Sequence, residues 1–343
     1  MIKLTHCYCL VLFMAVVAIG TGCKDQKVTK PDVSNIQLEV KVERFDQDLF
    51  ALDTLQIERS VATLKQKYPD FFDIFVNNLI VTDPPQTPEA TIRGFVTFPA
   101  IKKLHDTCNI VYPNLDWLQG ELTQSMKYLK YYLQKKQTPK FLTFISEYAN
   151  AVITYGDSSQ TKFGIGLDMF LGGNYKIYES FLPHYIKRSQ DKQHLVSKTM
   201  DALVQDLTPR PIGQRLLDQM IYNGRAIYLK KLLLPNTPDS VLLEYTSKQM
   251  KWCNENEQNM WLHFISENLL YSTDRDKIQK LVNPSPNSPN MPAEAPGRSG
   301  NFIGWKIVES FMKNNPKVTV ADLIEMKDAQ YVMDKAKYKP NRN

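Results

Sequence analysis

Hydrophobic residues recur at three- and four-residue steps along most of the chain, which is the spacing of one face of an α-helix. The clearest stripe consists of Leu115, Leu118, Leu122, Met126, Leu129 and Leu133. It predicts a helix whose apolar face packs in the core. Between Leu55 and Ile80, Pro69 predicts a break into two helices. A proline inside a helix costs about 3 kcal/mol, whereas in the first turn its missing N–H is harmless.

A second pattern occupies residues 139–171, where short aromatic and β-branched runs are separated by Gly156, Asp157 and Ser158. The runs cover residues 141–145, 151–155 and 163–170. They predict the strands of a small sheet. The expected fold class is therefore α+β and predominantly α-helical, with a helical body and a small β-sheet.

The helical pattern returns after Gly173 and continues almost to the end of the chain. Thr246 is a candidate N-cap for one long helix that reaches about Leu270. Residues 283–296 contain five prolines, which exclude a helix or a central strand there. A surface loop of this length either covers a groove or is a simple solvent loop.

The N-terminus has the pattern of a bacterial lipoprotein signal. Lys3 precedes an apolar run from Leu10 to Ile19, and small residues then lead to Cys23. A membrane-spanning helix needs about 20 apolar residues, so the run is too short to remain as an anchor. We expect residues 1–22 to be removed and Cys23 to be lipidated; the alternative is ordinary secretion, with Cys23 incidental. Lys24 follows the cysteine, where an acidic residue is absent, and this favours the outer membrane without deciding its face.

Composition and charge describe an ordinary globular chain after this signal. The first 22 residues carry one charged side chain, Lys3, so the mature chain has 41 basic and 36 acidic groups and a net charge of +5. Its short, scattered basic clusters argue against nucleic-acid binding. Residues 23–38 are polar and predict a lipidated N-terminus and flexible tether. Residues 39–340 are expected to form a single globular domain.

Two cysteines, Cys108 and Cys253, remain in the folded body. Their spacing of 145 residues offers no metal-ligand signature. We expect both to be buried apolar residues, although an oxidising periplasm would also permit one disulfide between them.

Familiar catalytic motifs do not match this sequence. No two of the five histidines are four residues apart, as a zinc-peptidase helix requires. The Gly-x-Ser-x-Gly elbow is absent, and the segment from Gly297 to Gly300 lacks the Lys-Ser/Thr of a phosphate-binding loop. No catalytic residue, metal ligand or cofactor is therefore assigned. Gly300 and Gly304, four residues apart, instead favour close approach of a helix to a neighbour.

Four polar residues form the candidate pocket. Asp168 interrupts an apolar strand pattern, Tyr222 and Arg225 recur at helical spacing, and Arg298 follows the proline-rich loop. Because buried charges need partners, the simpler interpretation pairs Asp168 with one of the arginines in a structural ion pair.

Several separated segments, in this order, resemble the gliding-motility-associated lipoprotein GldB family of Bacteroidota. They are residues 42–50 (VERFDQDLF), 68–72 (YPDFF), 164–172 (GIGLDMFLG), 220–228 (MIYNGRAIY) and 296–305 (PGRSGNFIGW). The resemblance covers nearly all of the mature chain. It implies a lipoprotein of the outer membrane that is connected with gliding motility and the envelope machinery serving it, without established enzymatic activity.

The family is also similar to zinc peptidases that carry a His-Glu-x-x-His helix and a Gly-Arg-x-Gly segment. Asn223 stands near the position where such enzymes offer an acidic ligand. The resemblance therefore implies a degenerate zinc-peptidase-like scaffold. The expected function is non-enzymatic binding of other envelope, motility or secretion proteins, with the membrane reached through the lipid on Cys23. The alternative is a divergent hydrolase acting on peptide or cell-wall substrate.

Overall fold

Four strands in the described part of the chain form one mixed sheet in the order β1-β2-β4-β3. The computed structural model describes residues 30–157 and 160–341. The strands are β1 (Val42–Arg44), β2 (Lys140–Phe144), β3 (Val152–Asp157) and β4 (Gln160–Gly166). β1, β2 and β4 are parallel, whereas β3 pairs with β4 in the antiparallel sense and is an edge strand. The sequence pattern located β2, β3 and β4 but not β1, which is only three residues long.

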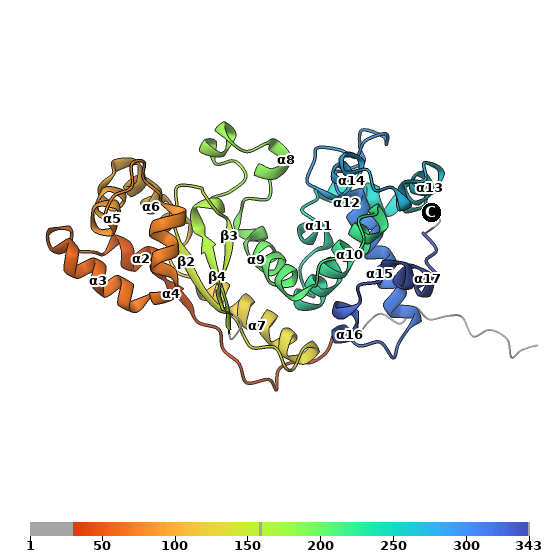
Figure 1. The fold of residues 1–343 in the computed structure, drawn as a ribbon, viewed down its shortest axis with the longest axis horizontal. Helices are drawn as coiled ribbons and strands as arrows, with labels where there is room; N and C mark the ends of the chain where they lie inside the picture. The colour runs from red at the N-terminus through yellow and green to blue at the C-terminus, as the bar shows by residue number, and fades with distance from the viewer. Residues whose placement is uncertain (1–29, 158–159, 342–343) are drawn as a thin grey trace, which may run out of the picture. The chain divides into compact units, whose positions relative to one another are not determined.

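In the described residues, helices connect β1 to β2 and follow β4, whereas β2, β3 and β4 succeed one another without a helix between them (Figure 1). The N-terminal helices are α2 (Phe45–Phe50), α3 (Ile57–Lys67), α4 (Pro69–Ile74), the π-helix η2 (Phe75–Leu79), α5 (Pro88–Thr97), α6 (Pro99–Val111) and α7 (Asp116–Tyr132), with a 3-10 turn η1 (Thr54–Gln56). After the sheet come η3 (Leu167–Met169), η4 (Lys176–Ser180), α8 (His184–Lys187), α9 (Lys192–Leu207), α10 (Leu216–Leu233) and α11 (Asp239–Leu242). The last group is α12 (Ser247–Glu255), α13 (Glu257–Ser266), η5 (Leu269–Tyr271), α14 (Arg275–Val282), α15 (Ser299–Asn314), α16 (Val320–Glu325) and α17 (Ala329–Ala336).

Helices account for 58% of the described residues, which confirms the predominantly α-helical α+β class. The predicted break at Pro69 is also confirmed, because Pro69 occupies the first turn of α4 directly after α3. The leucine stripe lies on α7, with Leu118, Leu122 and Leu129 buried.

Two predicted elements are wrong in extent. The helix that begins after the Thr246 cap ends at Glu255, and α13 starts separately at Glu257. The Asn256 amide donates to the carbonyl of Trp252 at 3.0 Å, and this side-chain bond competes with continuation of the helix. The strand expected over residues 163–170 ends at Gly166, where the chain tightens into η3.

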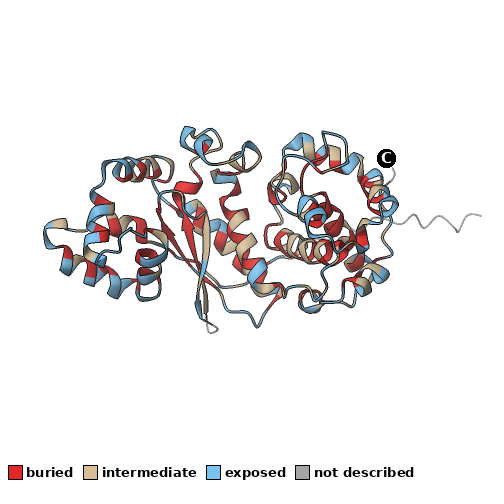
Figure 2. Ribbon diagram, turned by 45° about the horizontal axis from the view of Figure 1, so that its top comes forward, coloured by how far each residue is buried: buried red, intermediate tan, exposed pale blue. Residues whose placement is uncertain are grey.

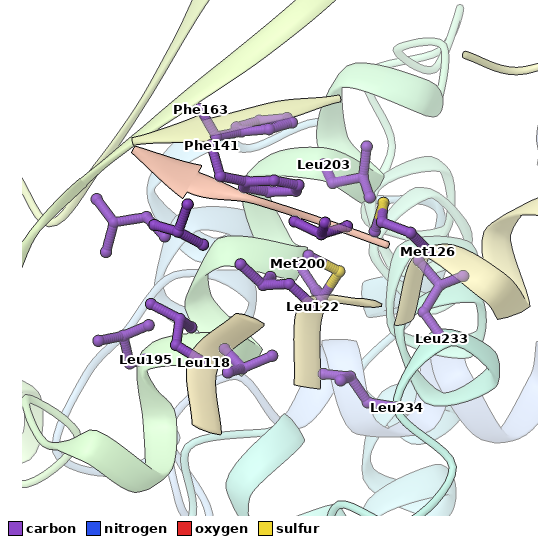
Figure 3. Close-up of a cluster of buried hydrophobic side chains, with 14 of the residues drawn as sticks. Leu118, Leu122, Met126, Phe141, Phe163, Leu195, Met200, Leu203, Leu233 and Leu234 are labelled. Carbon is purple, nitrogen blue, oxygen red and sulfur yellow. The ribbon is translucent and has the colours of Figure 1, made fainter. Parts of the chain in front are cut away.

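The sheet separates two hydrophobic layers because successive strand side chains point to opposite faces. On one face, Phe141, Phe163 and Ile165 pack against α7 and α9. Figure 3 shows Phe141 and Phe163 extending toward Leu203 and Met200. On the other face, Leu142 and Phe144 pack against α2 to α5.

A further core lies among α10, α12 to α15 and α17. α10 joins it to the sheet, because its N-terminal half packs in this core while Leu229 and Leu233 pack in the layer under the sheet. Figure 2 shows buried residues along the strands and on the inner sides of the helices. Val33 is only 3% exposed and packs in the same core as Phe141 and Phe163. Packing therefore begins inside the segment that was expected to be a tether.

Cys108 and Cys253 are both buried free thiols, which confirms their interpretation as apolar core residues and excludes the disulfide. The close helix approach is confirmed as well. A Cβ built on Gly304 would lie 2.0 Å from the Met220 carbonyl oxygen, and one on Gly224 would lie 2.4 Å from the main chain of Gly304. α10 and α15 therefore cross in backbone contact at these two glycines.

Candidate functional site

A cavity of about 470 Å³ lies at the meeting point of β3, α9, α10, α11 and α15. The beginning of the proline-rich loop contributes Asn283 and Pro284 to its wall, so this loop borders a groove. The polar and charged residues that line the cavity are Lys198, Asp201, Gln205, Asn223, Lys230, Glu244, Asn283, Arg298 and Asn301. A cavity of this size is within the range that holds small ligands or a few residues of a peptide.

Glu244 is the centre of the charged lining. One carboxylate oxygen accepts from Lys198 Nζ at 2.8 Å and from Ser189 Oγ at 2.7 Å, and the other accepts from Arg298 Nη1 at 3.3 Å. Burial opposes ionisation, but the charges of Arg298 and Lys198 outweigh it and hold the pKa of Glu244 well below its usual range. Glu244 is thus a permanent anion in the neutral pH range.

A second ion pair in the lining joins α9 to α10. Lys230 Nζ contacts Asp201 at 2.6 Å and donates to the main-chain carbonyl of Leu242 at 2.5 Å. The Lys230 side chain is 2% exposed and that of Asp201 is 30% exposed. Burial raises the pKa of Asp201 and outweighs the opposing effect of the Lys230 charge. Its carboxyl group therefore takes up a proton more readily than an exposed aspartate does.

The backbone is strained at the two residues that form the central pair. Glu244 has a φ of 54° and Arg298 a φ of 62°. Both angles lie in the left-handed region, which residues other than glycine and asparagine rarely adopt. The structure holds both in place, since Arg298 Nη2 donates to the carbonyl of Leu243 at 2.7 Å and Tyr245 OH donates to the carbonyl of Gly297 at 2.9 Å. Such strain costs of order 1–3 kcal/mol per residue and concentrates at functional sites.

Two asparagines on the crossing helices line the cavity. Asn223 Nδ2 donates to Asn301 Oδ1 at 2.8 Å, and Asn301 Nδ2 donates to the carbonyl of Val282 at 2.9 Å. They meet because α10 and α15 approach so closely at Gly224 and Gly304. The pair presents amide groups that suit hydrogen bonding to a polar ligand.

Of the four residues predicted to form a pocket, only Arg298 lines this cavity. Arg225 is buried on α10 and donates to the carbonyls of Leu323, Ile324, Met326 and Pro209, so it holds the segment around α16 in place. Burial lowers its pKa to about 10. Tyr222, also on α10, is half-buried outside the cavity lining.

Asp168 lies fully buried just beyond β4. Its Oδ2 accepts from the main-chain N–H groups of Ser146 and Tyr148, at 3.1 and 2.6 Å. Burial raises its pKa to about 6 although these hydrogen bonds lower it. The interpretation as an ion pair with an arginine is wrong within the described residues, because Oδ2 accepts from backbone amides and Oδ1 is buried without a hydrogen-bond partner there.

Sequence reasoning missed Lys198, Asp201, Lys230 and Glu244. In the sequence, Lys198 and Asp201 of α9 and Lys230 of α10 resemble ordinary charged residues on a helix surface. Glu244 follows a short apolar run. No local spacing marks them, because their partners come from segments far apart in the chain. In residues 30–157 and 160–341, no group of three or more His, Cys, Asp or Glu side chains is placed to hold a metal ion.

Fold and site together define a predominantly helical α+β protein with a charged cavity beside the edge of a small sheet. A family model described as gliding motility protein GldB matches residues 26–340, and the chain belongs to this family. The match confirms the resemblance stated from the separated segments, and it connects the protein with a lipoprotein family of gliding motility and hence with the cell envelope. No curated protein and no solved structure matches the chain. None of the helices in the described ranges is both long enough and apolar enough to cross a membrane.

Proposed function

We propose that the protein is a lipid-anchored lipoprotein of the outer membrane that serves gliding motility or its associated secretion machinery by binding another envelope protein. Family membership supports the connection with motility. The anchor is Cys23, which lies outside the described residues. Acyl chains contribute about 0.8 kcal/mol per buried CH₂, and more than one chain gives stable attachment.

The binding role rests on one observation, which is that the Glu244 carboxylate in the cavity already has three hydrogen-bond donors. Its carboxylate accepts from a lysine, an arginine and a serine, and these contacts keep it ionised. General acid–base catalysis needs a group whose pKa lies near the working pH, and the central carboxylate of this site is far from that condition. A fixed arrangement of charges and amides is well suited to holding a ligand in one orientation.

Site-specific photocrosslinking in intact cells tests this proposal. Gln205 is exposed and lines the cavity, so a photoreactive amino acid there should capture a partner protein. Leu55, 93% exposed on η1, provides the matched control position. Capture of the same envelope protein from position 205 and not from position 55 is the expected result. Equal capture from both positions, or capture from neither, would contradict binding at this cavity.

The second candidate function is a divergent hydrolase acting on peptide or cell-wall substrate, and Asp201 is the observation that favours it. Its carboxyl group borders the cavity and has a raised pKa, as a general acid requires. Purified protein incubated with peptide libraries and with peptidoglycan tests this function. Turnover that disappears in Asp201→Asn would establish the hydrolase, and its absence from the wild type would remove it.

A further inference from the structure

We infer that the cavity binds a carboxylate group carried by an extended peptide segment of the partner. This inference rests on the proposed function, since it names the chemistry by which a bound protein would be recognised. It is carried by an excess of cations around the cavity, by the strained backbone at Glu244 and Arg298, and by an unpaired sheet edge at the cavity wall.

Cations outnumber anions at this site. Among the described residues, Lys198, Lys230 and Arg298 line the cavity together with two carboxylates, those of Glu244 and Asp201. With these five groups charged the lining carries a net charge of +1, and Arg188, which contacts Glu244 from outside the lining, raises the net charge of the cluster to +2. The side chains of Lys198 and Arg298 are only 16% and 20% exposed, and that of Lys230 is 2% exposed. Uncompensated charge in such surroundings is costly, and an anion that enters the cavity relieves it.

Arg188 shows this excess directly. Its Nη2 donates to the main-chain carbonyl of Glu244 at 2.9 Å, while its Nε is buried without a hydrogen-bond partner among the described residues. Burial lowers the pKa of Arg188, and the nearby charge of Arg298 lowers it further. Two guanidinium groups therefore lie near a single glutamate, and a carboxylate that enters the cavity beside Arg298 would reduce the repulsion between them.

The strain at Glu244 and Arg298 indicates that the arrangement serves more than stability. Each residue occupies the left-handed region at a cost that a glycine would avoid. A simple structural ion pair does not require both partners to be strained. Strain of this kind is expected where side chains must be held in position for a ligand.

The sheet edge identifies the ligand as a peptide. Val152, the first residue of β3, and Ala151, just before it, form part of the cavity wall. β3 is the edge strand of the sheet, and its outer side pairs with no other strand in residues 30–157 and 160–341. An extended peptide can add to such an edge through main-chain hydrogen bonds while one of its side chains enters an adjoining pocket. The amides of Gln205, Asn223 and Asn283 provide additional polar contacts.

Fluorescence anisotropy with the full chain purified in detergent tests the inference. The probes are three labelled octapeptides that alternate valine with glutamate, with glutamine or with phosphoserine. We expect the glutamate peptide to bind about tenfold or more tightly than the glutamine peptide, because only its carboxylates meet the cationic cluster. Lys198→Gln should weaken the glutamate peptide by a similar factor, and Lys251→Gln, at a 74% exposed side chain on α12, should leave its affinity unchanged.

Arg298→Gln is the stronger perturbation, but Arg298 is fixed at a strained position and its loss can disturb folding. Lys198→Gln avoids this problem, since Glu244 retains its contacts with Arg298 and Ser189. Equal affinity for the glutamate and glutamine peptides, an unaffected Lys198→Gln variant, or binding of the phosphoserine peptide alone would overturn the inference. Capture of a partner from position 205 in cells together with any of these results would leave the proposed function standing and remove only the carboxylate subsite.

Discussion

Replacing Gly304 with alanine should force apart two helices that the structure holds in backbone contact. The added Cβ would lie 2.0 Å from the carbonyl oxygen of Met220 and 2.6 Å from its carbonyl carbon. Both atoms belong to the backbone of α10, so neither can rotate away as the end of a flexible side chain would. α15 must therefore shift relative to α10, and the core between these helices must repack.

Overpacking of a close contact costs typically 1–3 kcal/mol and occasionally more. Alanine recovers about 1 kcal/mol through its better helix propensity. Because the clash is with backbone on both sides of the crossing, we expect a net loss of about 3 kcal/mol. The unfolding entropy is about 2.1 cal/mol/K per residue, or about 0.65 kcal/mol/K for the unit that begins at Val33, so Tm should fall by about 5 °C.

Thermal unfolding followed by far-UV circular dichroism measures this change, and two further variants define its origin. Gly224→Ala acts at the other side of the same crossing, with its Cβ 2.4 Å from Gly304, and should lower Tm similarly. Gly120→Ala, in α7, meets nothing within 4 Å and should raise Tm by about 1 °C through helix propensity. A Gly304→Ala protein as stable as the wild type would refute the conclusion that the two helices are in backbone contact.

Three further predictions concern the anchor, a buried carboxyl group and the thiols. Cys23→Ala should abolish incorporation of radiolabelled fatty acid and move the protein out of the membrane fraction; an unchanged variant would exclude the anchor. Burial favours the protonated form of Asp168 in the folded state, so the stability it contributes is present near pH 4 and is lost as the pH rises through about 6. Asp168→Asn, whose amide oxygen can still accept from Ser146 and Tyr148, should therefore gain roughly 2–3 kcal/mol over the wild type between pH 4 and pH 7 in denaturant titrations, and parallel pH profiles would contradict this. Burial raises the pKa of both Cys108 and Cys253, the latter to about 12, so a thiol reagent should modify neither in the native protein and both after unfolding.

The sequence predicted much of the secondary structure because periodicity and capping are local properties. The stripe on α7, the break at Pro69 and the three longer strands all follow from residues within a few positions of one another. The failures have different causes. The helix after Thr246 ends beside the local bond from the Asn256 amide to the Trp252 carbonyl, and Glu257, the first residue of α13, accepts a hydrogen bond at 2.9 Å from the OH of Tyr338, which is far along the chain. β1 is too short to show a pattern and is defined by its pairing with β2.

The candidate site was much less predictable, and Arg298 is the one proposed residue that the cavity contains. Asp168 and Arg225 were recognised correctly as unusual, since polar groups at buried positions must find partners. Their partners are main-chain groups, which the sequence does not distinguish. Glu244, the centre of the cavity, gave no signal because its significance depends on Ser189, Lys198 and Arg298 arriving from separate segments.

By itself, the sequence determined the fold class, the family and the expectation of a lipidated Cys23, because these depend on composition, local spacing and ordered motifs along the chain. Only the tertiary structure decided where the charges meet. It is the crossing of α10 and α15 at Gly224 and Gly304 that aligns Asn223 with Asn301, and it is the left-handed backbone at residues 244 and 298 that turns two ordinary charged side chains into the central pair of a cavity. Charged side chains interact according to their distance in space and not their separation along the chain. The pattern of residues in the sequence therefore does not predict which charges pair.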